Sequence, residues 1–149
     1  MEIRNMTIED YDTVYQLWLS CDGMGLNNLD DSREGIDKYL QRNPDTCFVA
    51  QEDDKIIGVI ISGHDGRRGF IYHTAVATEY RKKGIATKLV TKALEALKGH
   101  GIHKVALVVF DNNTSGNAFW EKCGFTLRTD LVYRNKAMTE MERINIKKR

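Results

Sequence analysis

Apolar residues recur at helical spacing in several stretches of this chain. Near the amino terminus, Tyr11, Tyr15 and Trp18 lie three or four residues apart, which favours a helix that packs these rings into the core, with a place in a substrate pocket as the alternative. Thr7 and Asp10 have the spacing of a capping box at the start of this helix. The four helices that such patterns and their capping residues predict cover residues 7–20, 32–42, 85–98 and 114–122.

Runs of β-branched and aromatic residues predict the strands. Thr46–Gln51 and Lys55–Gly63 flank a tight polar turn and should form an antiparallel hairpin. Lys104–Phe110 is apolar on both faces, so we expect it in the middle of the sheet. Because one helix joins Phe70–Ala77 to that strand, the two should run parallel in a βαβ unit. The remaining predicted strands are 2–6, 125–129 and 131–138.

The stretch from Phe70 to Lys98 combines a strand, a basic turn and an amphipathic helix. A helix amino terminus presents unpaired N–H groups and a partial positive charge, and a phosphate is a natural ligand there. Gly84 allows a close approach of the backbone, and Arg81, Lys82 and Lys83 add positive charge at the mouth. The alternative is an exposed basic loop between strand and helix. The turn lacks the Gly-Lys-Ser/Thr ending of a Walker A loop.

Two segments resemble motifs of the GCN5-related N-acetyltransferases (GNAT). Ala75 to Ala86, which ends in Arg-Lys-Lys-Gly-Ile-Ala, is similar to the family's Arg/Gln-x-x-Gly-x-Gly/Ala motif. Asn113 to Phe125 is similar to a later segment in which an Asn opens a helix and a Gly-Phe pair closes it. The resemblance covers nearly the whole chain and implies an α/β fold: a mixed, mostly antiparallel sheet flanked by helices, with two central parallel strands that splay apart.

The resemblance also implies the residues that hold acetyl-coenzyme A. The backbone of Ala75 and Val76 would bond the pantetheine arm, and the turn that follows would hold the pyrophosphate. Asn113 would bond the pantetheine arm or nearby cofactor atoms, with a plain helix cap as the alternative. Trp120 stands where many relatives carry a Tyr and would pack against the cofactor or the core, because indole has no proton to give near neutral pH. The turn residues are Arg81, Lys82, Lys83, Gly84, Ile85, Ala86 and Thr87.

Three side chains are candidates for the acid–base chemistry. Period-two alternation places Tyr72 on the strand face shared with Phe70 and Thr74, which is the acid–base face in relatives, and His73 on the opposite face. A histidine titrates near pH 6.5, which suits a base, although a buried structural histidine is the alternative. Tyr133 is the third candidate, and deprotonation through water needs no dedicated base.

Composition narrows the class of protein. With 149 residues, of which 42% are hydrophobic, we expect a single domain over residues 1–149, with 139–149 as a frayed or dimer-forming tail. A formal net charge of +1 gives no reason to expect a nucleic-acid partner. No apolar run approaches the length of a membrane span, so we expect no membrane partner and a cytoplasmic location. Cysteine and histidine lack metal-ligand spacing, so no metal is expected.

The loop between the first two helices carries several carboxylates, among them Asp30 and Asp31, which would favour a cationic substrate unless they are merely solvated. The sequence therefore predicts an acetyl-coenzyme A-dependent N-acetyltransferase that acts on a primary amine, either a small metabolite or a protein amino terminus. Direct attack in a ternary complex is favoured, since no Cys or Ser has a nucleophile's setting. The alternative is an acyl-coenzyme A-binding or regulatory module without turnover, which Trp120 would suit.

Overall fold

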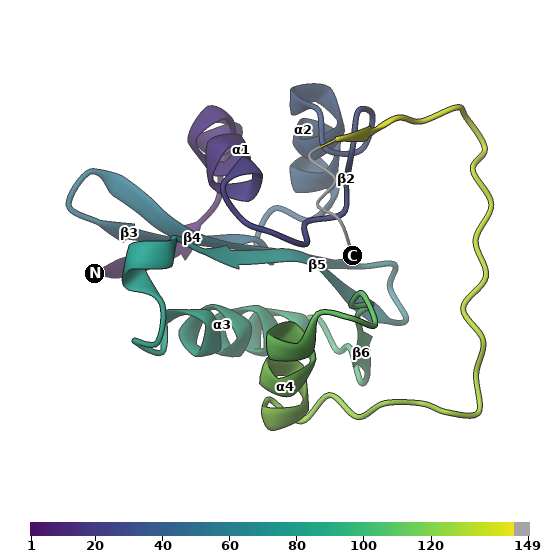
Figure 1. Ribbon diagram of the computed structural model, residues 1–149. Helices are drawn as coiled ribbons and strands as arrows, with labels where there is room; N and C mark the ends of the chain where they lie inside the picture. Colours follow the sequence, from purple (N-terminus) through teal and green to yellow (C-terminus); the bar gives the residue numbers. More distant parts are fainter. Residues whose placement is uncertain (145–149) are drawn as a thin grey trace.

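A five-stranded mixed sheet forms the centre of the computed structural model, which describes residues 1–144 (Figure 1). Neighbouring strands are antiparallel except for the last pair, β5 and β6, which is parallel. This arrangement confirms the predicted fold class. The strands, in their order across the sheet, are β1 (Glu2–Asn5), β3 (Phe48–Glu52), β4 (Lys55–His64), β5 (Gly69–Val76) and β6 (Val105–Ala106).

Two helices cover each face of the sheet (Figure 1). α1 (Tyr11–Leu19) and α2 (Arg33–Arg42) lie on one face, and α3 (Ile85–Gly99) and α4 (Thr114–Lys122) lie on the other. All four are close to the predicted ranges. A short 3₁₀ turn, η1 (Ile8–Asp10), leads into α1, and the Thr7 N–H donates to Asp10 Oδ2 at 2.9 Å, as the predicted capping box requires.

The sheet separates two apolar layers, and β4 contributes to both. Val59 and Ile61 pack toward α1, while Ile60 packs toward α3. This explains why the strand is a continuous apolar run rather than an alternating one. A Cβ added to Gly58 would lie 3.1 Å from Leu89 Cδ1, so the glycine lets α3 pack closely on the sheet. The hairpin between β3 and β4 is also confirmed, and Asp53 forms its turn with φ 55°.

β6 differs from the prediction. The strand covers only Val105–Ala106 instead of Lys104–Phe110, and within residues 1–144 it is an edge strand rather than a central one. It pairs with β5 only at Gly69–Phe70, and Val108 beyond it is 58% exposed. The prediction of a strand is therefore right only for Val105–Ala106, and the prediction of a central position in the sheet is wrong.

The segment after α4 also contradicts the prediction. The strands expected at 125–129 and 131–138 are absent, and the chain extends from α4 around the sheet edge to the opposite face (Figure 1). There β7 (Arg143–Ile144) pairs antiparallel with β2 (Leu26–Asn27), a short strand inside the predicted loop after α1. The start of the charged tail thus pairs within the chain. The rest of that tail, residues 145–149, lies outside the described residues.

No helix within residues 1–144 combines the length and the apolarity needed to cross a bilayer.

Candidate functional site

The amino terminus of α3 is open to an anion. Gly84 occupies the N-cap position in the left-handed conformation, with φ 78°, and provides no side chain to cap the helix. The first hydrogen bond of the helix runs from the Lys88 N–H to the Gly84 carbonyl. The N–H groups of the first turn come before this bond and have no acceptor within the helix. A Cβ on Gly84 would meet nothing within 4 Å. The glycine is therefore required by its backbone angle rather than by crowding.

The basic residues of this turn have different positions. Lys82 is also left-handed, with φ 63°, and the Lys83 ammonium lies 5.3 Å from the centre of the Tyr80 ring. Arg81 turns inward: its Nε donates to the Val76 carbonyl at 3.1 Å and its Nη2 lies 3.5 Å from Cys21 Sγ. Arg81 thus ties the turn to the end of β5, a role that the prediction of positive charge at the mouth did not include.

The parallel strands splay apart beside this turn. β5 continues to Val76, six residues beyond Phe70, where its pairing with β6 ends. Ala75 and Val76, the predicted backbone contacts, are buried and pair with β4 on one side. Within residues 1–144, no strand pairs with the other side of β5 beyond Phe70, although Arg81 already donates to the Val76 carbonyl.

The loop after α1 approaches the start of α4 across this gap. A Cβ built on Gly23 would lie 3.7 Å from Asn113 Nδ2, and one on Gly25 would lie 3.5 Å from the Phe110 ring. Asn113 Oδ1 accepts the Gly116 N–H at 2.9 Å, which is the cap that the sequence offered as the plain alternative. Capping occupies the oxygen, while the amide nitrogen faces the loop.

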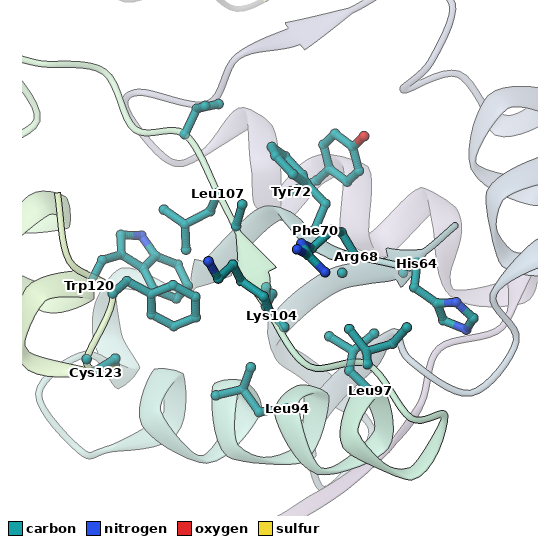
Figure 2. Close-up of a pocket in the computed structure, with 18 of the residues that line it drawn as sticks. His64, Arg68, Phe70, Tyr72, Leu94, Leu97, Lys104, Leu107, Trp120 and Cys123 are labelled. Carbon is teal, nitrogen blue, oxygen red and sulfur yellow. The ribbon is translucent and has the colours of Figure 1, made fainter. Parts of the chain in front are cut away.

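Trp120 lies in an aromatic cluster on α4. Its ring centre is 4.9 Å from that of Phe119 and 5.3 Å from that of Phe125, with both pairs nearly perpendicular. Figure 2 shows the indole on the wall of a cavity that Leu107 also lines. The described structure therefore supports packing for this residue.

Tyr72 and His73 do not lie on opposite faces of β5 as alternation predicted. The register with β4 shifts between Ile60 and Ser62, which marks a bulge where two residues of β5 face one of β4. Both side chains consequently point toward the helices α1 and α2. Tyr72 makes an edge contact with Tyr39 of α2, and His73 makes one with Trp18 of α1. Thr74 pairs with Ile60 and lies toward α3, so it does not share the face of Tyr72.

His73 forms a short pair with Asp31. Its Nε2 lies 2.6 Å from Asp31 Oδ1, and the two side chains are only 14% and 6% exposed. Asp31 is fixed from other directions, because Oδ2 accepts the Asn27 N–H at 2.8 Å and its carbonyl accepts the Tyr11 hydroxyl at 2.6 Å. A carboxylate only accepts hydrogen bonds, so in neutral His73 the pair places the hydrogen on Nε2 and leaves a lone pair on Nδ1.

This pair changes the interpretation of the acidic loop. Asp31 was expected to bind substrate or to be solvated, yet it is buried and holds a histidine. Asp30 remains at the surface, where its carboxylate accepts from Asn27 Nδ2 at 3.1 Å. Of the two aspartates, only Asp30 is therefore free to face a substrate cation.

Tyr72 is half-exposed beside the pair. Its ring lies 4.7 Å from Phe70, centre to centre. Partial burial raises the pKa of Tyr72, and the nearby Asp30 carboxylate and Tyr133 raise it further. The phenol therefore stays protonated at neutral pH and is unsuited to accept a proton. Tyr133 is exposed on the extended segment after α4, near enough to Tyr72 to interact with it electrostatically.

Two of the three thiols, those of Cys47 and Cys123, lack the properties of a nucleophile. Burial raises the pKa of Cys123 and raises that of Cys47 to about 12. Within residues 1–144, no group of three or more His, Cys, Asp or Glu side chains is arranged to hold a metal ion.

The site thus joins an uncapped helix amino terminus and the part of β5 beyond its pairing with β6 to an imidazole that Asp31 holds. The sequence offered Trp18 for a substrate pocket only as the alternative to core packing, and it did not identify Tyr39 or Cys21 as neighbours of the site. The latter two come from distant elements, and nothing in their local pattern distinguishes them from ordinary core.

Comparison with known proteins agrees with this geometry. A model described as "Acetyltransferase (GNAT) family" matches residues 11–125. A curated acetyltransferase of Sodalis glossinidius is 31% identical over 140 residues, which cover 94% of this chain and 97% of the relative.

Solved structures show the same fold. The PaiA N-acetyltransferase of Thermoplasma acidophilum, solved with coenzyme A, is similar with a TM-score of 0.73 at 21% identity, over 85% of this chain and 90% of that one. An aminoglycoside 6′-N-acetyltransferase of Acinetobacter haemolyticus has a TM-score of 0.72 at 18% identity, over 93% and 100%.

Proposed function

The chain belongs to the acetyltransferase (GNAT) family, and we propose that it transfers the acetyl group of acetyl-coenzyme A to a primary amine by direct attack in a ternary complex. The observation that carries the proposal is the uncapped amino terminus of α3 after left-handed Gly84. It lies beside the end of β5, beyond the residues that pair with β6. This combination offers N–H donors for a pyrophosphate next to a backbone edge for an amide-containing arm.

The donor half of the site, which consists of the start of α3, the end of β5 and Asn113, has residues in the positions that acetyl-coenzyme A would need. The first turn of α3, from Ile85 to Thr87, would hold the pyrophosphate, with Lys82 and Lys83 at its mouth. The end of β5 at Ala75 and Val76 would bond the pantetheine arm, and the Asn113 amide nitrogen would reach the same region. A solved structural neighbour contains coenzyme A, which supports this assignment. The bound thioester supplies the acetyl group.

His73 is the proton acceptor in this proposal. The attacking amine must lose a proton as its nitrogen bonds to the acetyl carbon, and Nδ1 of His73 carries the available lone pair. Asp31 acts through His73: it fixes the tautomer and stabilises the imidazolium that forms. The raised pKa of Tyr72 supports His73 over the tyrosine for this role.

The leaving thiolate needs no dedicated acid. A thiol of ordinary pKa, about 8.5, is a tolerable leaving group, and a positioned acid typically contributes only about 10²–10⁴-fold. Trp120 cannot provide that proton. Protonated Tyr72 or solvent can donate it instead. The natural acceptor is a cationic amine in this proposal, because Asp30 lies at the surface beside Tyr72.

The test is an assay of coenzyme A release with acetyl-coenzyme A and a panel of amines: polyamines, aminoglycosides and peptides with free amino termini. The proposal predicts release that depends on one class of amine, and product mass should rise by one acetyl group. His103→Gln is a matched control for His73→Gln, since His103 is exposed and lies outside the proposed site. Cofactor binding without transfer to any amine would instead favour the regulatory module.

A further inference from the structure

Two basic residues lie side by side where the parallel strands begin. Arg68 immediately precedes β5, Lys104 immediately precedes β6, and the Gly69 N–H donates to the Lys104 carbonyl at 3.0 Å. The strand register, which pairs Gly69 with Val105, places the two basic residues at equivalent positions. Two like charges at neighbouring positions repel each other. An anion between them would remove this repulsion.

Both basic residues border a cavity of about 1620 Å³. Figure 2 shows the side chains of Arg68 and Lys104 extending into it beside Phe70. Arg42 and Lys98 line the same cavity, but they lie in the last turns of α2 and α3, where a helix dipole favours a cation. This explanation does not apply to Arg68 or Lys104, because each precedes a strand.

The protein itself does not neutralise these two charges. Within residues 1–144, neither Arg68 nor Lys104 forms an ion pair. The acidic residues that line the cavity are Asp65 and Glu121. Asp65 accepts the backbone N–H groups of Arg67 and Arg68, both at 2.8 Å, so its carboxylate stabilises the β4–β5 loop. The start of the parallel pair is therefore left with a positive charge that faces the cavity.

Aromatic rings connect these two cations to the proposed site of amine attack. Phe70 follows Arg68 by two residues, and its ring centre lies 4.7 Å from that of Tyr72. Tyr72 is 53% exposed and lines the same cavity. The next residue of β5 is His73, the proposed proton acceptor. A molecule that lies along the two rings reaches from the cations toward His73.

The distance along β5 limits what such a molecule can be. Arg68 and His73 are five residues apart, which corresponds to about 16 Å of extended chain. The Arg68 side chain covers part of this distance, because it extends into the cavity (Figure 2). An amine and an anionic group on the same carbon atom are too close together to reach both ends. Several bonds must therefore separate the anionic group from the amine.

From these observations we infer that the acceptor is a primary amine with a carboxylate or phosphate several bonds from its nitrogen, and that Arg68 and Lys104 bind this anionic group. The inference rests on the proposed acetyl transfer and names the class of its acceptor. Asp30 suits the ammonium end of such a molecule, since its carboxylate lies at the surface near Tyr72. A polyamine or an aminoglycoside would place a further cation against Arg68 and Lys104, so both should be poor acceptors.

The first test compares acceptors that differ only in charge, at saturating acetyl-coenzyme A. The acid 6-aminohexanoate is matched by its neutral amide, and the tetrapeptide amide Ala-Ala-Ala-Glu is matched by Ala-Ala-Ala-Gln. We expect kcat/KM to be higher for the charged member of a pair by about tenfold or more, the usual worth of a hydrogen bond to a charged group. The phosphate 6-aminohexyl phosphate is a third charged acceptor, and the better of the two small acids identifies the anionic group.

A second test assigns this preference to the two cations. Arg68→Gln and Lys104→Gln should each raise KM for the charged acceptor about tenfold, with kcat and the affinity for acetyl-coenzyme A unchanged. Arg67→Gln is the matched control, because Arg67 is exposed in the same loop but does not line the cavity. Arg68→Glu should reverse the preference and favour the diamine 1,6-diaminohexane over 6-aminohexanoate.

The outcomes separate this inference from the proposed function. Equal kcat/KM for the charged and neutral members of both pairs would overturn the inference and leave acetyl transfer intact. A preference that Arg68→Gln and Lys104→Gln leave unchanged would also overturn it. Absence of coenzyme A release with every amine would overturn the proposed acetyl transfer, and the inference with it.

Discussion

The proposed site has a donor half, which would hold acetyl-coenzyme A, and an acceptor half, which would hold the amine. The two halves differ in composition. The donor half consists mainly of backbone: a left-handed glycine, the free N–H groups of a helix end and an unpaired strand edge. The acceptor half consists of side chains from three elements, with His73 on β5, Asp31 before α2 and Trp18 on α1. The halves meet at β5, which supplies the unpaired edge to one and the bulge to the other.

The difference shows what each half can tolerate. Many side chains can change in a backbone site as long as the glycine and the strand ends remain, so it suits the part of the reaction that is common to all acetyltransferases. A side-chain site changes with a single substitution. We therefore expect variants of the donor half to alter cofactor affinity, and variants of the acceptor half to alter turnover.

We expect the largest effect from Gly84→Asp, which should lower the affinity for acetyl-coenzyme A. A non-glycine residue at φ 78° costs roughly 1–2 kcal/mol, and the added carboxylate faces the same helix end as the phosphate. We expect the affinity for acetyl-coenzyme A to fall by at least about tenfold in a calorimetric titration, because a charge at a helix end is worth up to about 2 kcal/mol and about 1.4 kcal/mol is a tenfold change. Gly66→Asp is the matched control, since Gly66 has φ 91° and equally open surroundings but lies in the β4–β5 loop. Equal loss in both variants would contradict a local effect.

His73→Gln should affect the acceptor half of the site and lower turnover. Turnover should fall by about 10²–10⁴-fold, the usual contribution of a positioned base. The variant keeps a polar side chain but lacks the imidazole lone pair that accepts the proton of the amine. Steady-state turnover with a saturating amine measures the loss, with His103→Gln as the matched control. A variant with wild-type turnover would show that water alone removes the proton.

Arg81→Ala tests the connection between the halves. Removing the guanidinium frees the Val76 carbonyl from its bond and separates the turn from Cys21, which should cost about 1–2 kcal/mol of unfolding free energy. The affinity for acetyl-coenzyme A should fall several-fold as the turn loosens. Lys88→Ala removes an equal charge from the start of the same helix without these contacts. Thermal unfolding of both variants distinguishes the bond from the charge.

Tyr72→Phe should have the smallest effect. Because the pKa of Tyr72 is raised, its hydroxyl is protonated in wild type throughout the neutral range, and removing it cannot remove a base. The expected change in turnover is at most about tenfold, the worth of one neutral hydrogen bond. A larger loss of turnover would instead assign Tyr72 as the donor to the thiolate.

The sequence predicted the local structure of the donor half better than that of the acceptor half, for a physical reason. Gly84, the basic turn and the amphipathic pattern of α3 are local, so their meaning does not depend on the rest of the chain. The pair of His73 and Asp31 joins residues 42 positions apart, and a bulge that only the register with β4 specifies turns His73 toward α1. Strict alternation along β5 could not anticipate that bulge.

The same limit explains the errors at the carboxyl-terminal side. Residues 104–110 and 125–138 have strand character, and the structure leaves most of them unpaired within the chain. Strand character reports suitability for a pleated surface and not the presence of a neighbour. Pairing is non-local, so the strand character of these residues could not show whether a neighbouring strand is present.

One measurement tests the central claim most directly: calorimetric titration of acetyl-coenzyme A into wild type and His73→Gln side by side. The account predicts micromolar binding to both, with affinities that agree within about twofold, while only wild type turns over with an amine. Absence of binding to wild type would contradict the donor site itself. Loss of binding in His73→Gln alone would contradict the division of the site into a backbone half and a side-chain half.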